Sequence, residues 1–265
     1  MGVDKSSMFR LDGKLAIVTG GNRGIGKGVA RALAGAGANI LLADIAFGAA
    51  PGRQPDSVAE IEKEFGVEVI GVKVDVCQED DNKEMVKQAL DRFGRIDVLV
   101  CNAGIPSGGI LPEDMPVTKW DDIIDTNLRS FFIAAKEVYP VMVKGGGGKI
   151  ISIGSMTSLL GIGPFAVYGA SKGGVLQLTR GLASAWAKDK IQVNCILPGW
   201  INTDLSIRSK QRDPQLEQRI EKRTPAGRWG EIDDIEGTAI FLSSRASDFV
   251  TGAAIAVDGG YAIQG

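Results

Sequence analysis

The stretch Thr19-Gly20-Gly21-Asn22-Arg23-Gly24-Ile25-Gly26 determines the fold that this sequence predicts. An apolar run at residues 14–19 precedes it and is typical of a buried strand, and a helical pattern over residues 24–36 follows. Glycines at such a junction allow a tight turn and a close approach of the backbone to a pyrophosphate. The helix N-terminus adds free N–H groups and the positive end of its dipole. A plain strand-to-helix turn can look the same, so the surrounding sequence has to decide.

The next strand supports a dinucleotide-binding turn. Residues Asn39–Ala43 form a second apolar run, and Asp44 follows it directly. A carboxylate about 20 residues beyond the glycines is the group that hydrogen-bonds an adenosine ribose in such folds. Asp44 at an ordinary solvated strand end is the alternative. The turn and Asp44 together predict a dinucleotide site.

Strand and helix patterns alternate along the rest of the chain. We expect strands at 68–74, 96–100, 149–153, 191–196 and 254–257, and helices at 57–65 behind an Asp56 cap, 79–93, 118–144 capped by Thr118, 166–188 and 232–242. Residues 46–55 and 145–148 are predicted loops. This alternation predicts a doubly wound α/β fold of the Rossmann type, with about seven parallel strands and helices on both faces of the sheet. We expect one domain over residues 1–265.

Composition excludes several function classes. The chain has 265 residues and a net charge of −2, which gives no sign of a nucleic-acid or membrane partner. We find no apolar run long enough to cross a bilayer and no apolar signal-peptide core in residues 1–10, and therefore expect a cytosolic protein. Cys77, Cys101 and Cys195 are too scattered for a zinc or disulfide pattern, so no metal site is expected. The sequence contains no histidine, which excludes Ser-His-Asp hydrolases and histidine-dependent dehydrogenases.

Three side chains form a candidate catalytic set. Tyr168 and Lys172 are four residues apart in the helix predicted at 166–188, so both lie on one helix face. Ser155 comes just after the fifth predicted strand, where α/β active sites open. A tyrosine base needs its pKa lowered from about 10 toward about 7, and a neighbouring ammonium and a cationic nicotinamide favour the phenolate. A surface Tyr-Lys pair is common and is the alternative.

Further motifs occur in the order found in one known family. They are Asn102-Ala103-Gly104, Asn127 in Asp125-Thr126-Asn127-Leu128, Ser155 thirteen residues before Tyr168, Pro198-Gly199, and Asp258-Gly259-Gly260. With the glycine-rich turn, they make residues 11–261 resemble the short-chain dehydrogenase/reductase superfamily. Cys101 departs from the family, which usually has an asparagine there, and we expect it only to support its strand.

The resemblance implies a role for each motif. Tyr168 would be the general acid and base, Ser155 would bind the substrate oxygen, Lys172 would hold the nicotinamide ribose, and Asn127 would anchor a proton-relay water. The remaining implied contacts with the cofactor are Gly20, Asn22, Arg23, Gly24, Ile25, Gly26, Asp44, Asp75, Val76, Asn102, Ala103, Gly104, Pro198, Gly199, Ile201 and Thr203. Asp44 favours NAD over NADP because it would repel a 2′-phosphate. Arg23 is the complication, since a basic residue in this turn is frequent in NADP-dependent relatives.

The substrate follows less directly from the sequence. Residues 148–156 and 224–230 resemble sugar-acid and polyol dehydrogenases such as gluconate 5-dehydrogenase and 2-deoxygluconate 3-dehydrogenase, so we expect a small alcohol or ketone substrate. The alternatives are a 3-oxoacyl-carrier-protein reductase and a non-catalytic dinucleotide-binding regulator. An extended-family epimerase would need a larger C-terminal part.

Two further expectations concern surfaces of the molecule. Residues 200–228 carry seven basic and four acidic side chains, a net charge of +3, and are expected to form a mobile basic lid that favours an anionic or polyhydroxylated substrate. A solvated helix with mixed charges is the alternative. We also expect a homotetramer, as in the family, because helix 166–188 has apolar residues on more than one face: Val175, Leu176, Leu178, Leu182, Ala183 and Trp186.

Overall fold

A seven-stranded parallel sheet forms the centre of the molecule. The computed structural model describes residues 5–48 and 56–264, without the side chains of Leu205 and Arg208. The strand order is β3-β2-β1-β4-β5-β6-β7, and every neighbouring pair is parallel. The strands are β1 (Leu15–Thr19), β2 (Asn39–Ala43), β3 (Val69–Val72), β4 (Val98–Cys101), β5 (Gly148–Ile153), β6 (Ile191–Pro198) and β7 (Ala254–Val257). The predicted doubly wound fold is confirmed.

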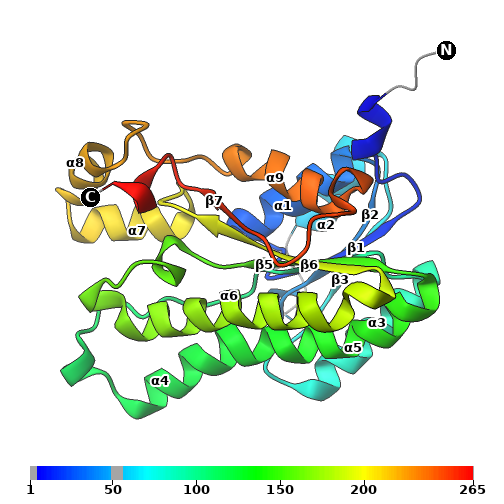
Figure 1. Ribbon diagram of the computed structural model, residues 1–265, viewed down its shortest axis with the longest axis horizontal. Helices are drawn as coiled ribbons and strands as arrows, with labels where there is room; N and C mark the ends of the chain where they lie inside the picture. Colours follow the sequence, from blue (N-terminus) through cyan, green and yellow to red (C-terminus); the bar gives the residue numbers. More distant parts are fainter. Residues whose placement is uncertain (1–4, 49–55, 265) are drawn as a thin grey trace.

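Helices cover both faces of the sheet (Figure 1). One face carries α1 (Gly24–Gly35), α2 (Ser57–Phe65) and α9 (Asp233–Ser243). The other carries α3 (Glu79–Phe93), α4 (Val117–Ile124), α5 (Ser130–Gly145) and α6 (Ala166–Trp186). Two large apolar clusters lie between these layers and the sheet. The central strands read as continuous apolar runs because they are buried on both sides.

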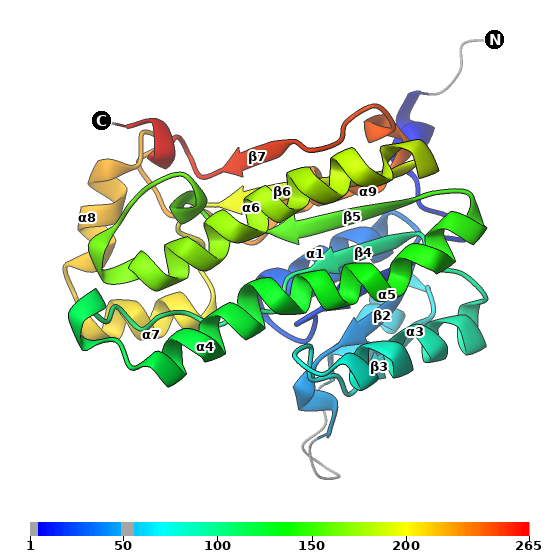
Figure 2. The same cartoon turned by 60° about the horizontal axis from the view of Figure 1, so that its bottom comes forward.

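The carboxyl ends of the strands meet at one edge of the sheet. The arrowheads of β5, β6 and β7 point toward α7 (Asp204–Arg212) and α8 (Leu216–Arg223), which extend beyond this edge (Figure 2). Ligands of open parallel sheets bind at this edge, next to the point where the strand order reverses. The expected lid segment is therefore placed over the edge where the site is expected.

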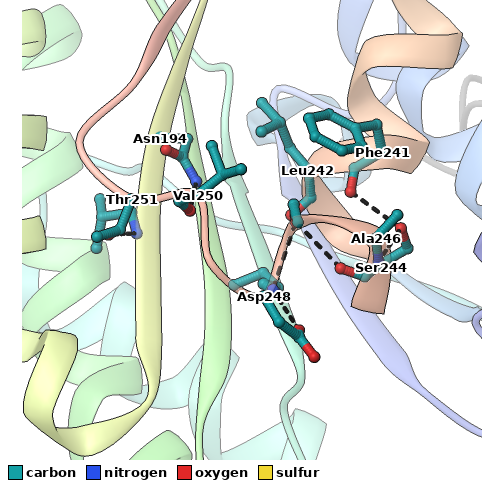
Figure 3. Close-up of polar contacts among 11 residues, drawn as sticks. Asn194, Phe241, Leu242, Ser244, Ala246, Asp248, Val250 and Thr251 are labelled. Carbon is teal, nitrogen blue, oxygen red and sulfur yellow. Dashed lines mark hydrogen bonds and ion pairs between the residues drawn. The ribbon is translucent and has the colours of Figure 1, made fainter. Parts of the chain in front are cut away.

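The opposite edge is fixed by buried polar side chains. Figure 3 shows the chain between α9 and β7, where the Asn194 amide donates to the carbonyl oxygen of Val250 at 2.8 Å. The hydroxyl of Thr251 accepts a hydrogen bond from the backbone of Val193 at 3.1 Å, and Ser244 accepts one from Ala246 at 3.3 Å. Asn194 is 1% exposed. These contacts hold β6 and β7 in register at the amino ends of the strands.

Some sequence predictions about helices need correction. The helix predicted behind Asp56 is confirmed as α2, with Asp56 at its N-cap position, although the Asp56 side chain makes no capping bond. In contrast, α4 begins after Pro116 rather than at a Thr118 cap. The helix predicted over 118–144 is interrupted by a π-helical turn at Asp125–Arg129. Part of the apolar face that was expected to be free on α6 is covered within the chain, because Leu178 and Trp186 are partly buried against the core and Trp186 stacks on Tyr139 of α5 with ring centroids 4.6 Å apart.

Loop and strand bounds also differ in detail. Residues Ile45–Gly48 of the predicted loop form a 3₁₀ turn, and 49–55 lie outside the described residues. The strand expected at 68–74 is limited to Val69–Val72, and the strand expected at 96–100 is shifted to Val98–Cys101. Such boundary shifts are common, because an apolar pattern predicts that an element exists more reliably than it predicts where the element begins and ends.

Candidate active site

The glycine-rich turn after β1 has the backbone geometry of a phosphate cradle. Gly20 and Gly24 have φ angles of +61° and +55°, in the left-handed region that favours glycine. A Cβ atom on Gly26 would overlap the carbonyl oxygen of Gly20 and the amide of Asn102. The backbone is therefore bare where α1 begins, and this arrangement fits the pyrophosphate of a dinucleotide.

Asn102 braces this turn from the neighbouring strand. Its amide nitrogen donates to the carbonyl oxygens of Thr19 and Gly20, each at 3.0 Å. The backbone N–H groups of Asn102 and Ala103 in turn donate to the Thr19 hydroxyl at 3.1 and 3.2 Å. The Asn102 side chain thus holds the turn open. Residues 102–104 would therefore meet a cofactor with their backbone.

A carboxylate lies beside the turn at the end of β2. The two oxygens of Asp44 accept hydrogen bonds from the backbone of Ala46 at 2.9 Å and of Asn22 at 3.4 Å. The Ser57 hydroxyl donates to the side-chain oxygen of Asn22 at 2.8 Å, which links α2 to the turn. Arg23 is exposed next to them. A ribose at the turn would therefore meet a carboxylate held by main-chain donors, as the spacing predicted.

The other predicted cofactor contacts lie along the same edge. Asp75, after β3, accepts from the backbone N–H of Cys77 at 3.0 Å, and Val76 beside it is buried. After β6, Gly199 approaches Asp258 so closely that a Cβ would lie 2.7 Å from its Cα, and Ile201 bridges to Gly230. The methyl group of Thr203 lies 3.8 Å from where a Cβ on Gly24 would be. Residues far apart in sequence thus form a track along the carboxyl ends of the strands of one sheet.

Ser155, Tyr168 and Lys172 come together next to this track. The Lys172 ammonium nitrogen lies 5.7 Å from the centre of the Tyr168 ring and donates to the Ile153 carbonyl oxygen at 2.7 Å. Ser155 caps the 3₁₀ turn Met156–Ser158 by accepting from the backbone of Thr157 at 3.1 Å. The predicted set is brought together by the end of β5 and the first turns of α6.

Burial sets the ionisation of this group. It raises the pKa of the Tyr168 phenol to about 12, and a hydrogen bond from Ser155 acts in the opposite direction. It lowers the pKa of the Lys172 ammonium to about 8, while the nearby Cys195 acts in the opposite direction. The sequence predicted a lowered tyrosine pKa, and the chain alone gives a raised one. Of the two cations expected to lower it, only the lysine belongs to the chain.

Asn127 lies in the π-helical turn and holds three segments together. Its amide nitrogen donates to the carbonyl oxygen of Ile105 at 3.0 Å and to the hydroxyl of Ser171 at 3.1 Å. Its side-chain oxygen accepts from the backbone of Ile105 at 2.7 Å. Ser171 also donates to the carbonyl oxygen of Tyr168 at 2.7 Å. π-Turns occur frequently at functional sites, and this one ties the loop after β4 to the helix that carries Tyr168.

Comparison with known proteins agrees with this arrangement. A family profile described as enoyl-(acyl carrier protein) reductase matches residues 20–262. A 2-dehydro-3-deoxy-D-gluconate 5-dehydrogenase of Formosa agariphila is 40% identical over 96% of this chain and 94% of its own, and the Escherichia coli K12 enzyme of the same name is 39% identical over 96% and 98%. A suggested gluconate dehydrogenase of Agrobacterium tumefaciens superposes with a TM-score of 0.89 at 40% identity, covering 96% of this chain and 98% of its own.

The chain belongs to the short-chain dehydrogenase/reductase superfamily. This short-chain dehydrogenase/reductase is therefore an oxidoreductase that uses a nicotinamide dinucleotide and acts on CH–OH groups. In the described part of the short-chain dehydrogenase/reductase, no three histidine, cysteine or acidic side chains gather as metal ligands. Within the same residues, no helix is long and apolar enough to span a bilayer.

Several residues that shape the site were missed by sequence reasoning. Ser171, Ile105 and Ser158 act through hydrogen bonds with distant parts of the chain, and Ser158 donates to the Lys172 carbonyl oxygen at 2.8 Å. Phe165 and Trp200 form an edge-on aromatic pair beyond them. Their sequence positions carry no spacing signal, because the contacts exist only once β5, β6 and α6 have been assembled.

Proposed function

We propose that this enzyme interconverts a secondary alcohol and a ketone of a sugar acid or polyol, with NAD(H) as the cofactor. The cluster of Ser155, Tyr168 and Lys172 at the carboxyl edge of the sheet carries the proposal for the reaction. The similarity to 2-dehydro-3-deoxy-D-gluconate 5-dehydrogenases over almost the full length supports the substrate class.

The roles of the chain's own residues follow from their chemistry. When bound, the nicotinamide supplies the acceptor for the hydride of the alcohol. Ser155 donates a hydrogen bond to the substrate oxygen, and Tyr168 takes the proton of the alcohol or returns it to the ketone. Lys172 holds positive charge beside Tyr168 and so favours the phenolate. Asn127 positions the loop after β4 and the α6 helix.

The cofactor is proposed to lie along the track from the glycine turn to Thr203. The phosphates would meet the backbone of residues 20–26, the adenine Asp75 and Val76, and the nicotinamide the segment of Pro198, Gly199, Ile201 and Thr203. Asp44 supports NAD, because a 2′-phosphate would lie beside its carboxylate. Two related structures, from Agrobacterium tumefaciens at 35% identity and Beutenbergia cavernae at 33%, hold NADP, which makes cofactor preference a necessary measurement.

Residues 200–228 are proposed to act as a substrate lid. Leu216 and Ile220 of α8 pack with Met156, Trp229 and Tyr261 near the catalytic end of the fold. Part of the basic surplus is balanced, since Lys210 pairs with Glu217 and Arg219 with Asp213. Arg212 and Lys222 have no acidic partner among the described residues. A lid of this kind would exclude water when closed and attract an anionic substrate.

A homotetramer and a cytosolic location complete the proposal. Four large apolar side chains on α4 and α5, Val117, Trp120, Phe132 and Val143, are between 40% and 74% exposed. Exposed apolar groups on neighbouring helices are typical of interfaces between subunits. This surface supports an interface on these helices in addition to the α6 face that the sequence suggested.

The deciding experiment is a substrate panel with both cofactors. D-gluconate, 2-dehydro-3-deoxy-D-gluconate, D-glucitol and an acetoacetyl thioester are compared as substrates with NAD(H) and NADP(H). We expect the highest kcat/KM on a sugar acid. Preference for the thioester would favour the 3-oxoacyl-carrier-protein reductase, a relative of which from Staphylococcus epidermidis is 37% identical. Cofactor binding with no turnover of any substrate would favour the alternative of a non-catalytic dinucleotide-binding regulator.

A further inference from the structure

A buried indole nitrogen next to the catalytic group has no hydrogen-bond partner. Nε1 of Trp200 is covered by protein atoms, and no acceptor for it lies among the described residues. Buried polar groups are paired in the large majority of cases, and an unpaired one costs stability. An indole nitrogen can only donate, so it calls for an oxygen atom or another acceptor.

Trp200 lies where a substrate would be held. It follows Pro198 and Gly199 at the carboxyl end of β6. Its ring packs edge-on against Phe165, with centroids 6.3 Å apart, and Phe165 immediately precedes the helix that carries Tyr168. On its other side it contacts Trp229 at 5.4 Å. The indole therefore stands between the catalytic helix and the segment proposed as a lid.

The described side chains that pack around Trp200 are mostly apolar. It packs against the cluster of Met156, Leu216, Ile220, Trp229 and Tyr261, which is apolar apart from the Tyr261 hydroxyl and the Trp229 N–H. Two of these residues, Leu216 and Ile220, belong to α8, so α8 forms part of the packing around the Trp200 side chain. The adjacent Trp229 differs in one respect: its own Nε1 donates to the Glu217 carbonyl oxygen, at 3.4 Å.

We propose that Trp200 is a specificity-determining residue whose indole N–H binds an oxygen atom of the substrate away from the reacting carbon. Ser155 and Tyr168 hold the reacting oxygen, so a donor beyond them selects a substrate that carries a second oxygen. A carboxylate or hydroxyl of a sugar acid fits this donor. The inference rests on the proposed function for the substrate class, but not for the presence of the donor.

The test removes the N–H group and keeps the shape of the ring. β-(3-benzothienyl)alanine is isosteric with tryptophan and lacks the donor, and it is introduced at position 200 and, as a matched control, at position 229. Thermal unfolding of the free proteins and kcat and KM for D-gluconate are measured, with Trp200→Phe and Trp229→Phe as conventional counterparts. Wild-type activity on D-gluconate tests the proposed function. If it is absent, the same variants are compared on whichever panel alcohol the wild type oxidises.

We expect position 200 to lose function without losing stability. The isostere there should lower kcat/KM about 10- to 100-fold, mostly through KM, because a hydrogen bond to a charged or polar substrate oxygen is lost. Its Tm should stay equal or rise by about 2 °C, since an unpaired buried donor has been removed. The isostere at 229 should keep kcat/KM within about two-fold.

Two results would overturn the inference. One is an unchanged kcat/KM at position 200 on a substrate with a second oxygen. The other is a fall in Tm at 200 that exceeds the fall at 229, which would mean that the Trp200 N–H is paired inside the fold, for example with the face of the Trp229 ring.

Discussion

The Lys172 ammonium nitrogen and the Ile153 carbonyl oxygen lie 2.7 Å apart, in a hydrogen bond that joins α6 to the end of β5. The lysine is 4% exposed, and its burial lowers the pKa to about 8. One main-chain carbonyl therefore fixes the direction of a buried cation beside Tyr168. The burial of this lysine makes the stability of the fold depend on pH in a predictable way.

The free energy of unfolding that depends on Lys172 should rise between pH 8 and pH 10. The folded pKa is about 8 and the unfolded value is about 10.4, so the unfolded chain binds more protons in this window and stability increases with pH. Below pH 8 the lysine is charged in both states and its burial is fully unfavourable. Urea unfolding of the wild type and Lys172→Met is measured at each pH. Between pH 8 and pH 10, the free energy of unfolding of the wild type should rise relative to that of Lys172→Met by about 2 kcal/mol. A difference between the two proteins that does not change with pH would contradict the buried charge.

Replacing Tyr168 by phenylalanine should remove turnover and spare cofactor binding. The ring keeps its packing, while the transferable proton is lost, and loss of a general acid or base costs about 10²–10⁴ in rate. Fluorescence titration with the dinucleotide serves as the control. Lys172→Ala, in contrast, should weaken both turnover and cofactor affinity. Near wild-type turnover in Tyr168→Phe would exclude this tyrosine as the proton donor and acceptor.

Cofactor preference should depend on Asp44. Like charges about 4 Å apart at an effective dielectric near 20 repel by about 4 kcal/mol, so the wild type should use NAD more efficiently than NADP. In Asp44→Ser the ratio of kcat/KM values should move at least about ten-fold toward NADP. Arg23→Ala is the matched change in the same turn and should move the ratio the other way. Equal or better use of NADP by the wild type would reject the preference.

Placing a charge on the exposed surface of α5 should break the proposed tetramer. Phe132 is 48% exposed, and a glutamate there would bury an unpaired charge in any interface that covers it. Light scattering at micromolar concentration should give a tetramer for the wild type and a smaller species for Phe132→Glu. Ile263→Glu, at an 88% exposed position near the C-terminus, is the control. A monomeric wild type would disprove the assembly.

The lid should recognise an anion through an arginine that has no acidic partner among the described residues. Arg219 pairs with Asp213, with 2.7 Å between nitrogen and oxygen, whereas Arg212 has no acidic partner in the described part of the chain. Arg212→Gln should therefore lower kcat/KM for D-gluconate more than for D-glucitol, and Arg219→Gln should do so less. Arg208→Gln is compared on D-gluconate and D-glucitol in the same way. If all three variants affect acid and polyol equally, the lid does not recognise the carboxylate.

Local patterns were sufficient to predict the sheet and much of the candidate site. Apolar runs flanked by turn residues located all seven strands, and the signal was strongest for the central ones, because a strand buried on both faces must be apolar throughout. The tyrosine-lysine spacing placed both side chains on one helix face, and the glycine turn and Asp44 meet as expected. The raised pKa of Tyr168 could not be predicted in this way, because it depends on burial by segments from distant parts of the chain.

The failures of sequence reasoning have a common physical cause. Trp186 looked available to a partner, but its ring is taken up by Tyr139 of a neighbouring helix. The charges of residues 200–228 predicted a basic lid but not how much of that charge is balanced within the segment, where Lys210 lies over the Trp229 ring at 4.2 Å and pairs with Glu217. Helical periodicity shows that a face is apolar or charged. It does not show which element of the same chain covers it.

The π-helical turn at Asp125–Arg129 has a consequence for how this chain can vary in length. Its hydrogen bonds span five residues where an α-helix spans four, as in the bond from Ser130 to Asp125, so the turn holds one residue more than a continuous helix needs. Deleting one residue there would join α4 and α5 into an uninterrupted helix with better backbone bonding. The same deletion would turn Asn127 away from Ile105 and Ser171. A change in length that a surface helix would tolerate would therefore displace Asn127 from its partners at this point, while the fold itself would accept it.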